Sequence, residues 1–275
     1  MLAGKSEHKR GLEEGDDHLG SPERFGYSWD HFHKLTPQQE RQFQLWTTHL
    51  SPASDWKGKR FLDAGCGAGR NSYWPMSYGA SSCVSVDLDE RSLRAARENL
   101  SVFPAAEVRR CSIYDLDYDD EFDIAFSIGV IHHLDNPGLA VQKLAQATKP
   151  GGLVLIWVYG YENLEFYVHV LNPLRKLFFS WMPLWLVKLL AYLPTTALWL
   201  MLKLGITPLE YLRLLKGFPF AHLHHIIFDQ MLPRIANYWT RQQASDLLQS
   251  AGLVDVKTAW VNEVSWSVVG RKPVC

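Results

Sequence analysis

Short apolar segments alternate with helical segments between residues 59 and 160. The apolar segments read KRFLDAG, SCVSVDL, AEVRRCS, FDIAFSIG and GLVLIWVYG. Between the second and the third, DERSLRAARENL places Leu93, Ala96 and Leu100 on one helical face behind the capping residue Asp89. Strands that alternate with helices build parallel sheets with helices on both faces, so this pattern predicts an α/β fold.

The C-terminal part of the chain has a different pattern. Thr240 and Gln243 form a capping box that opens a helix, and Ala251 and Gly252 mark its end. Two segments rich in Trp and Val follow, DVKTAWV and SWSVVG. We expect these two segments to form an antiparallel strand pair that completes the sheet.

Residues 161–235, which we call the cap, interrupt the alternation. They are rich in Leu, Trp, Phe and Tyr and are punctuated by prolines. We predict a helical, hydrophobic cap over the ligand-binding edge of the sheet. Lys188, Lys203 and Pro194 interrupt its apolar runs, so we expect no span of the roughly 18 to 20 apolar residues that a membrane crossing needs. Peripheral contact with a membrane is kept as an alternative.

The composition fits one large domain with an insertion. The chain has 275 residues, 47% of them hydrophobic, and a formal net charge of −1, so no global field points to nucleic acid or to an acidic membrane. Its start is polar and Gly-rich, and its four cysteines show no CxxC spacing. We therefore expect a cytoplasmic protein with reduced thiols. We divide the chain into a flexible tail 1–22, an N-terminal helical segment 23–57, a core 58–160, the cap 161–235, and a C-terminal helix and strand pair 236–275.

A glycine-rich loop follows the first predicted strand. Gly65, Gly67 and Gly69 come directly after this strand, which ends near Asp63, and they precede a helical segment. Such glycines allow a tight turn and a close approach of the backbone to a ligand. Asp87 ends the next strand about 20 residues later, where a carboxylate can accept both hydroxyls of a ribose. Together they predict a nucleoside-bearing ligand at the carboxyl edge of the sheet.

These segments also resemble a known family. DAGCGAGRNS resembles the signature loop of class I S-adenosylmethionine (SAM)-dependent methyltransferases, and VSVDLD is similar to their ribose-binding strand end. FDIAFSIGVIHHLDNP and TKPGGLVLI resemble their fourth and fifth strands with the adjoining loops. The resemblance implies a Rossmann-like, seven-stranded, mostly parallel sheet with the last strand antiparallel, and SAM as the bound molecule without a metal.

The resemblance also implies a set of SAM-binding residues. Asp63 and Gly65 would lie near the methionine amino group, with Cys66, Gly67 and Gly69 in the loop beneath it. The other implied contacts are Asp87 on the ribose, Leu88, Ser112 and Ile113 around the adenine, and Ile128 and Gly129 near the sulfonium. A subset of the family has an aromatic segment upstream, similar to RFGYSWDHF, from which Tyr27 and Trp29 could face the cation.

Several residues are candidates for the chemistry. His132 follows the fourth strand and could serve as a base, although an HH pair there could equally cap a helix or pack. Tyr159, Tyr161 and Asn163 follow the fifth strand and could contact the substrate or the methionine part of SAM. The histidines of PFAHLHHIIFD suit substrate contacts or packing better than a metal site, because no cysteine or carboxylate cluster accompanies them.

Two reactions fit this set of residues. In the first, a small molecule attacks the methyl group of SAM; the lack of a basic stripe disfavours nucleic acid as the acceptor. The second comes from a further resemblance: the aromatic N-terminal segment, GYEN and the hydrophobic cap look like the SAM-consuming azetidine-2-carboxylate synthases of natural-product pathways. In those enzymes the amine of SAM attacks its own γ carbon and yields azetidine-2-carboxylate and methylthioadenosine. A non-catalytic SAM-binding or membrane-associated protein is a third possibility. The sequence does not indicate the oligomeric state.

Overall fold

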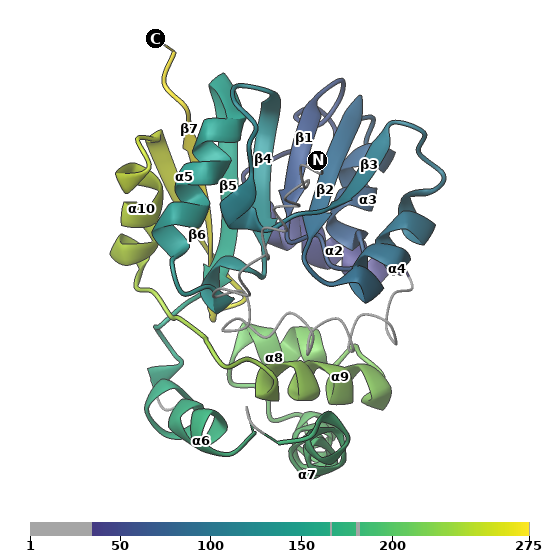
Figure 1. Ribbon diagram of the computed structural model, residues 1–275. Coiled ribbons are helices and arrows are strands. Elements are labelled where there is room, and N and C mark those ends of the chain that lie inside the picture. The colour runs from purple at the N-terminus through teal and green to yellow at the C-terminus, as the bar shows by residue number, and fades with distance from the viewer. Residues whose placement is uncertain (1–34, 166, 180–181, 275) are drawn as a thin grey trace, which may run out of the picture.

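The computed structural model describes residues 35–165, 167–179 and 182–274. Its centre is a seven-stranded sheet with the strand order β3-β2-β1-β4-β5-β7-β6 (Figure 1). The strands are β1 (Arg60–Ala64), β2 (Ser82–Asp87), β3 (Ala106–Arg110), β4 (Phe122–Ile128), β5 (Thr148–Tyr159), β6 (Val254–Val261) and β7 (Ser265–Arg271).

The first five strands are parallel, whereas β7 pairs antiparallel with both β5 and β6. This confirms the predicted Rossmann-like sheet with an antiparallel last strand. The strand order reverses between β1 and β4, because β2 and β3 extend the sheet on one side of β1 and β4 and β5 extend it on the other. Ligands of open α/β sheets bind at such a switch point, outside the carboxyl ends of the strands.

Helices cover both faces of the sheet. One core joins the strands to α5 (Pro137–Ala147) and α10 (Arg241–Ser250), and includes the buried Leu144 and Leu248. The other core joins them to α2 (Pro37–Trp46) and α3 (Arg70–Ser77), and includes the buried Phe43. The central strands read as nearly continuous apolar runs because both of their faces are buried.

The helix ends follow the predicted capping signals. Asp89 accepts hydrogen bonds from the backbone at the start of α4 (Glu90–Leu100). At the start of α10 the Thr240 hydroxyl accepts from the N–H of Gln243, whose side chain accepts in turn from the backbone of Thr240. Each such cap satisfies a backbone donor that has no partner within the helix.

The cap contains most of the helices outside the sheet layers. Below the carboxyl ends of the strands lie α8 (Glu210–Leu215) and α9 (Phe220–Met231), and α7 (Leu184–Lys203) lies beyond them (Figure 1). A π-helical turn (Tyr167–Leu171) and α6 (Asn172–Leu177) connect β5 to this group. The cap and the sheet therefore face each other across the edge at which a ligand is expected.

The length of α7 corrects one expectation. Pro194 does not interrupt it: the helix continues through this proline for 20 residues, and by length and composition it could cross a membrane. Proline removes one helical hydrogen bond, from the carbonyl of Leu190 four residues earlier. Both residues lie on the exposed side of the helix, where water can satisfy that carbonyl.

Candidate functional site

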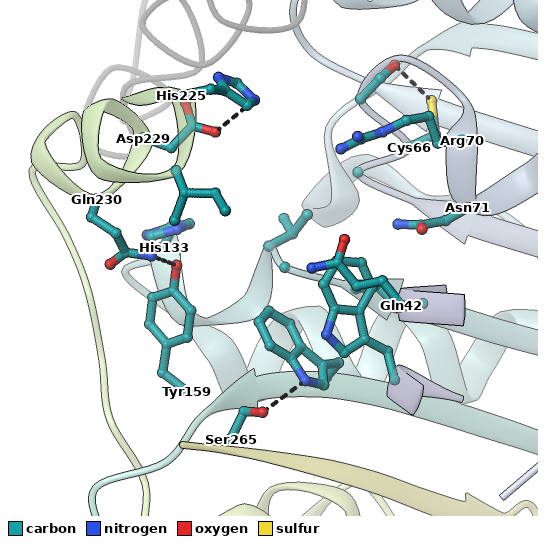
Figure 2. Close-up of a pocket in the computed structure, with 18 of the residues that line it drawn as sticks. Gln42, Cys66, Arg70, Asn71, His133, Tyr159, His225, Asp229, Gln230 and Ser265 are labelled. Atoms are coloured by element: carbon teal, nitrogen blue, oxygen red, sulfur yellow. Dashed lines mark hydrogen bonds and ion pairs between the residues drawn. The ribbon is translucent and has the colours of Figure 1, made fainter. Parts of the chain in front are cut away.

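A cavity of about 720 Å³ lies between the carboxyl ends of the strands and the cap. This volume falls within the range of about 300–1,000 Å³ typical of small-molecule sites. Residues from the loops after β1, β2 and β4 line one side, and residues of α8 and α9 line the other. Gln42 and Trp46 of α2 also reach it, so three parts of the chain that are distant in sequence enclose one space (Figure 2).

The glycine-rich loop forms one wall of the cavity. Gly65, Gly67 and Gly69 all have positive φ angles, of 84°, 51° and 74°. A Cβ atom at position 65 would lie 2.3 Å from a methyl carbon of Val130, so any side chain there would clash with the neighbouring loop. The turn therefore needs glycine for both its backbone conformation and its close packing.

Asp87 fixes this loop from the end of β2. Its carboxylate accepts hydrogen bonds from the N–H groups of Gly67, at 2.9 Å, and of Asp89, at 3.1 Å. Burial raises the pKa of Asp87, while these backbone hydrogen bonds oppose the increase. Each carboxylate oxygen has a further lone pair, so a carboxylate held in this way can still accept from ligand hydroxyls.

Most of the predicted SAM-binding residues border this cavity. The Ser112 hydroxyl accepts a hydrogen bond from the N–H of Tyr114. Through this bond Ser112 caps a short 3₁₀ turn beside the cavity. The predicted residues that line the cavity are Gly65, Cys66, Gly67, Asp87, Leu88, Ser112, Ile113, Ile128, Gly129 and Tyr159. Tyr27 and Trp29 lie outside the described residues.

Asp63 does not line the cavity. Its fully buried carboxyl group accepts a hydrogen bond of 2.6 Å from the Ser72 hydroxyl, which lies 2.7 Å from the Ser85 hydroxyl. Burial raises the pKa of Asp63 to about 7. Asp63 thus connects β1 to α3 from below the glycine loop, and Gly69, the N-cap of α3, is likewise outside the cavity lining.

Tyr159 is the predicted catalytic candidate that reaches the cavity. Its hydroxyl oxygen accepts a hydrogen bond of 2.9 Å from the Gln230 amide (Figure 2). Its ring lies between those of His132 and Tyr238, with centroid distances of 3.6 and 5.6 Å. Burial raises its pKa, so the hydroxyl stays protonated and can donate to a ligand.

The other catalytic candidates do not line the cavity. The His132 ring is fully buried against Tyr159, and burial holds its pKa well below the usual value. The Tyr161 hydroxyl contacts His169 Nε2 at 2.9 Å. Asn163 has a positive φ angle of 65° and donates its amide to the Glu263 carbonyl, as expected of a turn residue. His133, next to His132, lines the cavity instead.

The sequence reasoning considered His225 for a substrate contact or for packing but missed its partner Asp229 on the cap side. His225 and Asp229 are one helical turn apart on α9, with 3.3 Å between His225 Nε2 and an Asp229 oxygen. Both line the cavity and lie across it from Arg70 and Cys66 (Figure 2). Burial, followed by the nearby Arg70 charge, lowers the pKa of His225 to about 3. The imidazole is therefore neutral and hydrogen-bonds the carboxylate.

Other lining residues were also not predicted. Arg70 directly follows the glycine loop, so its position in the motif could have identified it, and the spacing of His225 and Asp229 suits one helix face. Asn71 follows Arg70 in the same motif, whereas other lining residues carry no local signal, among them Gln42, Trp46, Trp157, Gln230 and Tyr238. Within the described ranges, no group of three or more His, Cys, Asp or Glu residues could hold a metal ion.

Comparison with known proteins identifies the sheet and its loops. Residues 62–156 match the family model described as a methyltransferase domain. This part of the chain is therefore similar to methyltransferase domains. The matched residues run from β1 to β5, and so contain the glycine loop and Asp87. The cap lies outside them.

Individual relatives agree with this assignment. A tRNA U34 carboxymethyltransferase of Hahella chejuensis is 35% identical over 134 residues, which cover 46% of this chain and 39% of that enzyme. A ubiquinone biosynthesis O-methyltransferase of Neisseria meningitidis serogroup C is 28% identical over 127 residues, 45% of this chain and 53% of that enzyme. The matched regions thus span about half or less of these methyltransferases.

A solved structure extends the similarity in fold beyond the core. It is Haemonchus contortus phosphoethanolamine N-methyltransferase 2, in complex with phosphomonomethylethanolamine and S-adenosylhomocysteine. Its TM-score is 0.55 at 15% identity, with 91% of this chain and 57% of that chain covered. At this identity the likeness concerns the methyltransferase fold alone.

Proposed function

We propose that this protein is a SAM-dependent methyltransferase whose acceptor is a small molecule. One observation carries the proposal: a single cavity connects the glycine loop and Asp87 with the His225–Asp229 pair of the cap. This cavity therefore joins a place for a nucleoside with a place for a second reactant. The core forms the nucleoside half of the cavity, and the cap forms the half for the second reactant.

The first half has the chemistry that SAM requires. Asp87 would accept the ribose hydroxyls, and Leu88 and Ile113 would border the adenine. The tight turn at Gly65 keeps side chains away from the backbone that the ligand approaches. When bound, SAM supplies an electrophilic methyl group on a positively charged sulfur, so the protein needs only to align a nucleophile and exclude water.

The second half favours a largely apolar acceptor that carries one polar group. Leu198, Leu212 and Ile226 line this part of the cavity, next to the neutral imidazole of His225 and the carboxylate of Asp229. Such walls fit a phenol, an alcohol or an amine on an apolar scaffold. One curated relative is named for tRNA and another for ubiquinone biosynthesis. The size of the cavity, about 720 Å³, and the net charge of −1 support the smaller kind of acceptor here.

The His225–Asp229 pair is suited to take up a proton. The acceptor's lone pair bonds to the methyl carbon, the carbon–sulfur bond breaks with its electron pair left on sulfur, and S-adenosylhomocysteine leaves. The acceptor's proton moves to the carboxylate of Asp229. The neutral His225 ring does not take up this proton, but its hydrogen bond to Asp229 holds the carboxylate in place.

One observation supports the alternative reaction, the cyclisation of SAM to azetidine-2-carboxylate. Five tyrosines line the cavity and could surround a sulfonium: Tyr114, Tyr159, Tyr167, Tyr211 and Tyr238. Two groups that this reaction was expected to use, Tyr161 and Asn163, make other contacts outside the cavity. The room beneath the cap, which cyclisation does not need, therefore favours methyl transfer.

The two reactions are separated by incubating the purified protein with SAM alone and identifying the products by mass spectrometry. Methyl transfer predicts that SAM persists until an acceptor is added, after which S-adenosylhomocysteine and a methylated product appear. Methylthioadenosine together with a four-membered cyclic amino acid, formed by the wild type but not by the Asp87→Ala variant, would overturn the proposal in favour of cyclisation.

A further inference from the structure

The outer side of α7 is an exposed apolar face. Four of its residues, together with Leu204 just after it, follow one another at spacings of four or seven, which places them on a single helical face. Their exposed fractions are 68% for Trp185, 59% for Leu189, 80% for Leu193, 50% for Leu200 and 77% for Leu204. Large apolar side chains gathered in this way mark an interaction surface rather than scattered surface residues.

The opposite side of the same helix is already occupied. Val187 and Ala191 are fully buried, and they pack against Phe228 and Leu232 at α9 and its end. A helix on the surface of a domain normally has one apolar stripe and one polar face. Since both faces of α7 are apolar and only the inner face packs against the rest of the cap, the outer face requires another explanation.

The charges on α7 itself have one sign. The helix carries Lys188 and Lys203 and no acidic residue. The ammonium group of Lys203 lies over the Trp199 ring, 5.6 Å from its centroid. Exposed leucines with Trp and flanking lysines are the composition of helices that lie in the headgroup region of anionic membranes.

We propose that the outer face of α7 docks the protein on an anionic lipid membrane. The helix would lie in the plane of the membrane–water interface. It would not cross the bilayer, because crossing would separate its inner face from α9 and expose Phe228 and Leu232. A second copy of the chain fits this face less well, since pairing it with itself would bring its lysines together. This proposal holds whether or not the protein transfers methyl groups.

Docking would also bring the cavity near the bilayer. Leu198 of α7 lines the cavity, and α9 contributes His225 and Asp229 to it. Only this helical layer would separate a docked membrane from the acceptor half of the cavity. If the protein is the proposed methyltransferase, we therefore expect its methyl acceptor to be an amphiphilic molecule dissolved in the membrane. This expectation rests on the proposed function.

The test is co-sedimentation of the full chain with phosphatidylcholine vesicles, with and without phosphatidylglycerol, in the absence of SAM. We expect binding that needs phosphatidylglycerol and weakens with salt. Leu193→Glu combined with Leu200→Glu should weaken binding at least about tenfold, because it removes apolar contact and adds negative charge. Val102→Glu is the matched control: Val102 is 65% exposed but lies between α4 and β3, away from the cap.

Thermal melting of each variant shows that the fold is intact, as expected for changes at exposed positions. Equal pelleting of the wild type and the double variant, or no pelleting with either vesicle, would overturn the proposal. So would a dimer in gel filtration that the double variant converts to a monomer, because a second copy would then cover the face. Since no SAM is present, a failed methyltransferase assay leaves this result unaffected.

Discussion

Replacement of Asp87 should abolish most of the affinity for the nucleoside. The two oxygens of its carboxylate already accept one backbone N–H each, from Gly67 and Asp89, so the group is held in place before any ligand binds. Hydrogen bonds to a charged group contribute about 1.5–3 kcal/mol each. Loss of two ribose contacts therefore corresponds to about 3 kcal/mol or more, a rise in Kd of at least about 100-fold.

The assay is calorimetric titration of S-adenosylhomocysteine into the wild type, Asp87→Ala and Asp87→Asn. The asparagine keeps the size of the side chain and one acceptor oxygen, so we expect its Kd to lie between those of the other two proteins. The alanine variant also leaves the Gly67 N–H without its acceptor, which loosens the glycine turn.

Asp89→Ala is the control for the effect of helix α4. Asp89 caps this helix with its side chain, so its loss should cost about 1 kcal/mol of stability. Its backbone N–H still reaches Asp87, and the affinity for S-adenosylhomocysteine should remain that of the wild type. The reasoning fails if folded Asp87→Ala binds the ligand as tightly as the wild type does.

Three further changes test other parts of the structure. Burial raises the pKa of Asp63 from 3.8 to about 7, so the folded protein retains a proton that the unfolded chain loses, and stability falls as the pH rises between these values. Asp63→Asn should therefore raise the free energy of unfolding by up to about 4 kcal/mol at about pH 8 and leave it unchanged at about pH 3, as measured by urea denaturation; a constant difference at all pH values would contradict this. Asp229→Asn should lower kcat at least about tenfold with an unchanged Kd for S-adenosylhomocysteine, because only the uptake of the acceptor's proton by Asp229 is impaired; an unchanged kcat would remove the pair from the mechanism. Gly65→Ala should lower the melting temperature and weaken S-adenosylhomocysteine binding together, since its methyl group clashes with Val130; wild-type values of both would show that the loop adapts.

The sheet could be predicted because its signals are local. Each central strand is an apolar run ended by a turn or cap residue, and parallel strands buried on both faces leave that pattern in the sequence. The glycine loop and Asp87 belong to one strand–turn–helix–strand unit, so their spacing alone brings them together. Tertiary contacts are not needed to find this half of the site.

The cap half was predicted only in outline. The sequence predicted a helical cap over the sheet edge and left His225 open between a substrate contact and packing, but no local pattern pairs His225 with Asp229 or states which helix face turns toward the cavity. Tyr161 and Asn163 were chosen because they follow β5. However, the bridge between Gly160 and Trp239 and the left-handed turn at Asn163 direct the chain elsewhere.

The orientation of the two histidine rings in the turn after β4 could not be predicted from the sequence either. The 3₁₀ turn Ile131–His133 buries the ring of His132 and leaves that of His133 on the cavity wall. Adjacent histidines look equivalent in a sequence, but in a 3₁₀ turn successive side chains point about 120° apart, so only one of the two rings reaches the cavity.

The most direct test of the central claim is a crystal structure of the complex with S-adenosylhomocysteine. The account predicts ribose hydroxyls within hydrogen-bonding distance of the Asp87 carboxylate, and a sulfur atom that faces the part of the cavity lined by Tyr159, His225 and Asp229. A nucleoside bound away from Asp87, or a sulfur walled off from the cap side of the cavity, would contradict it.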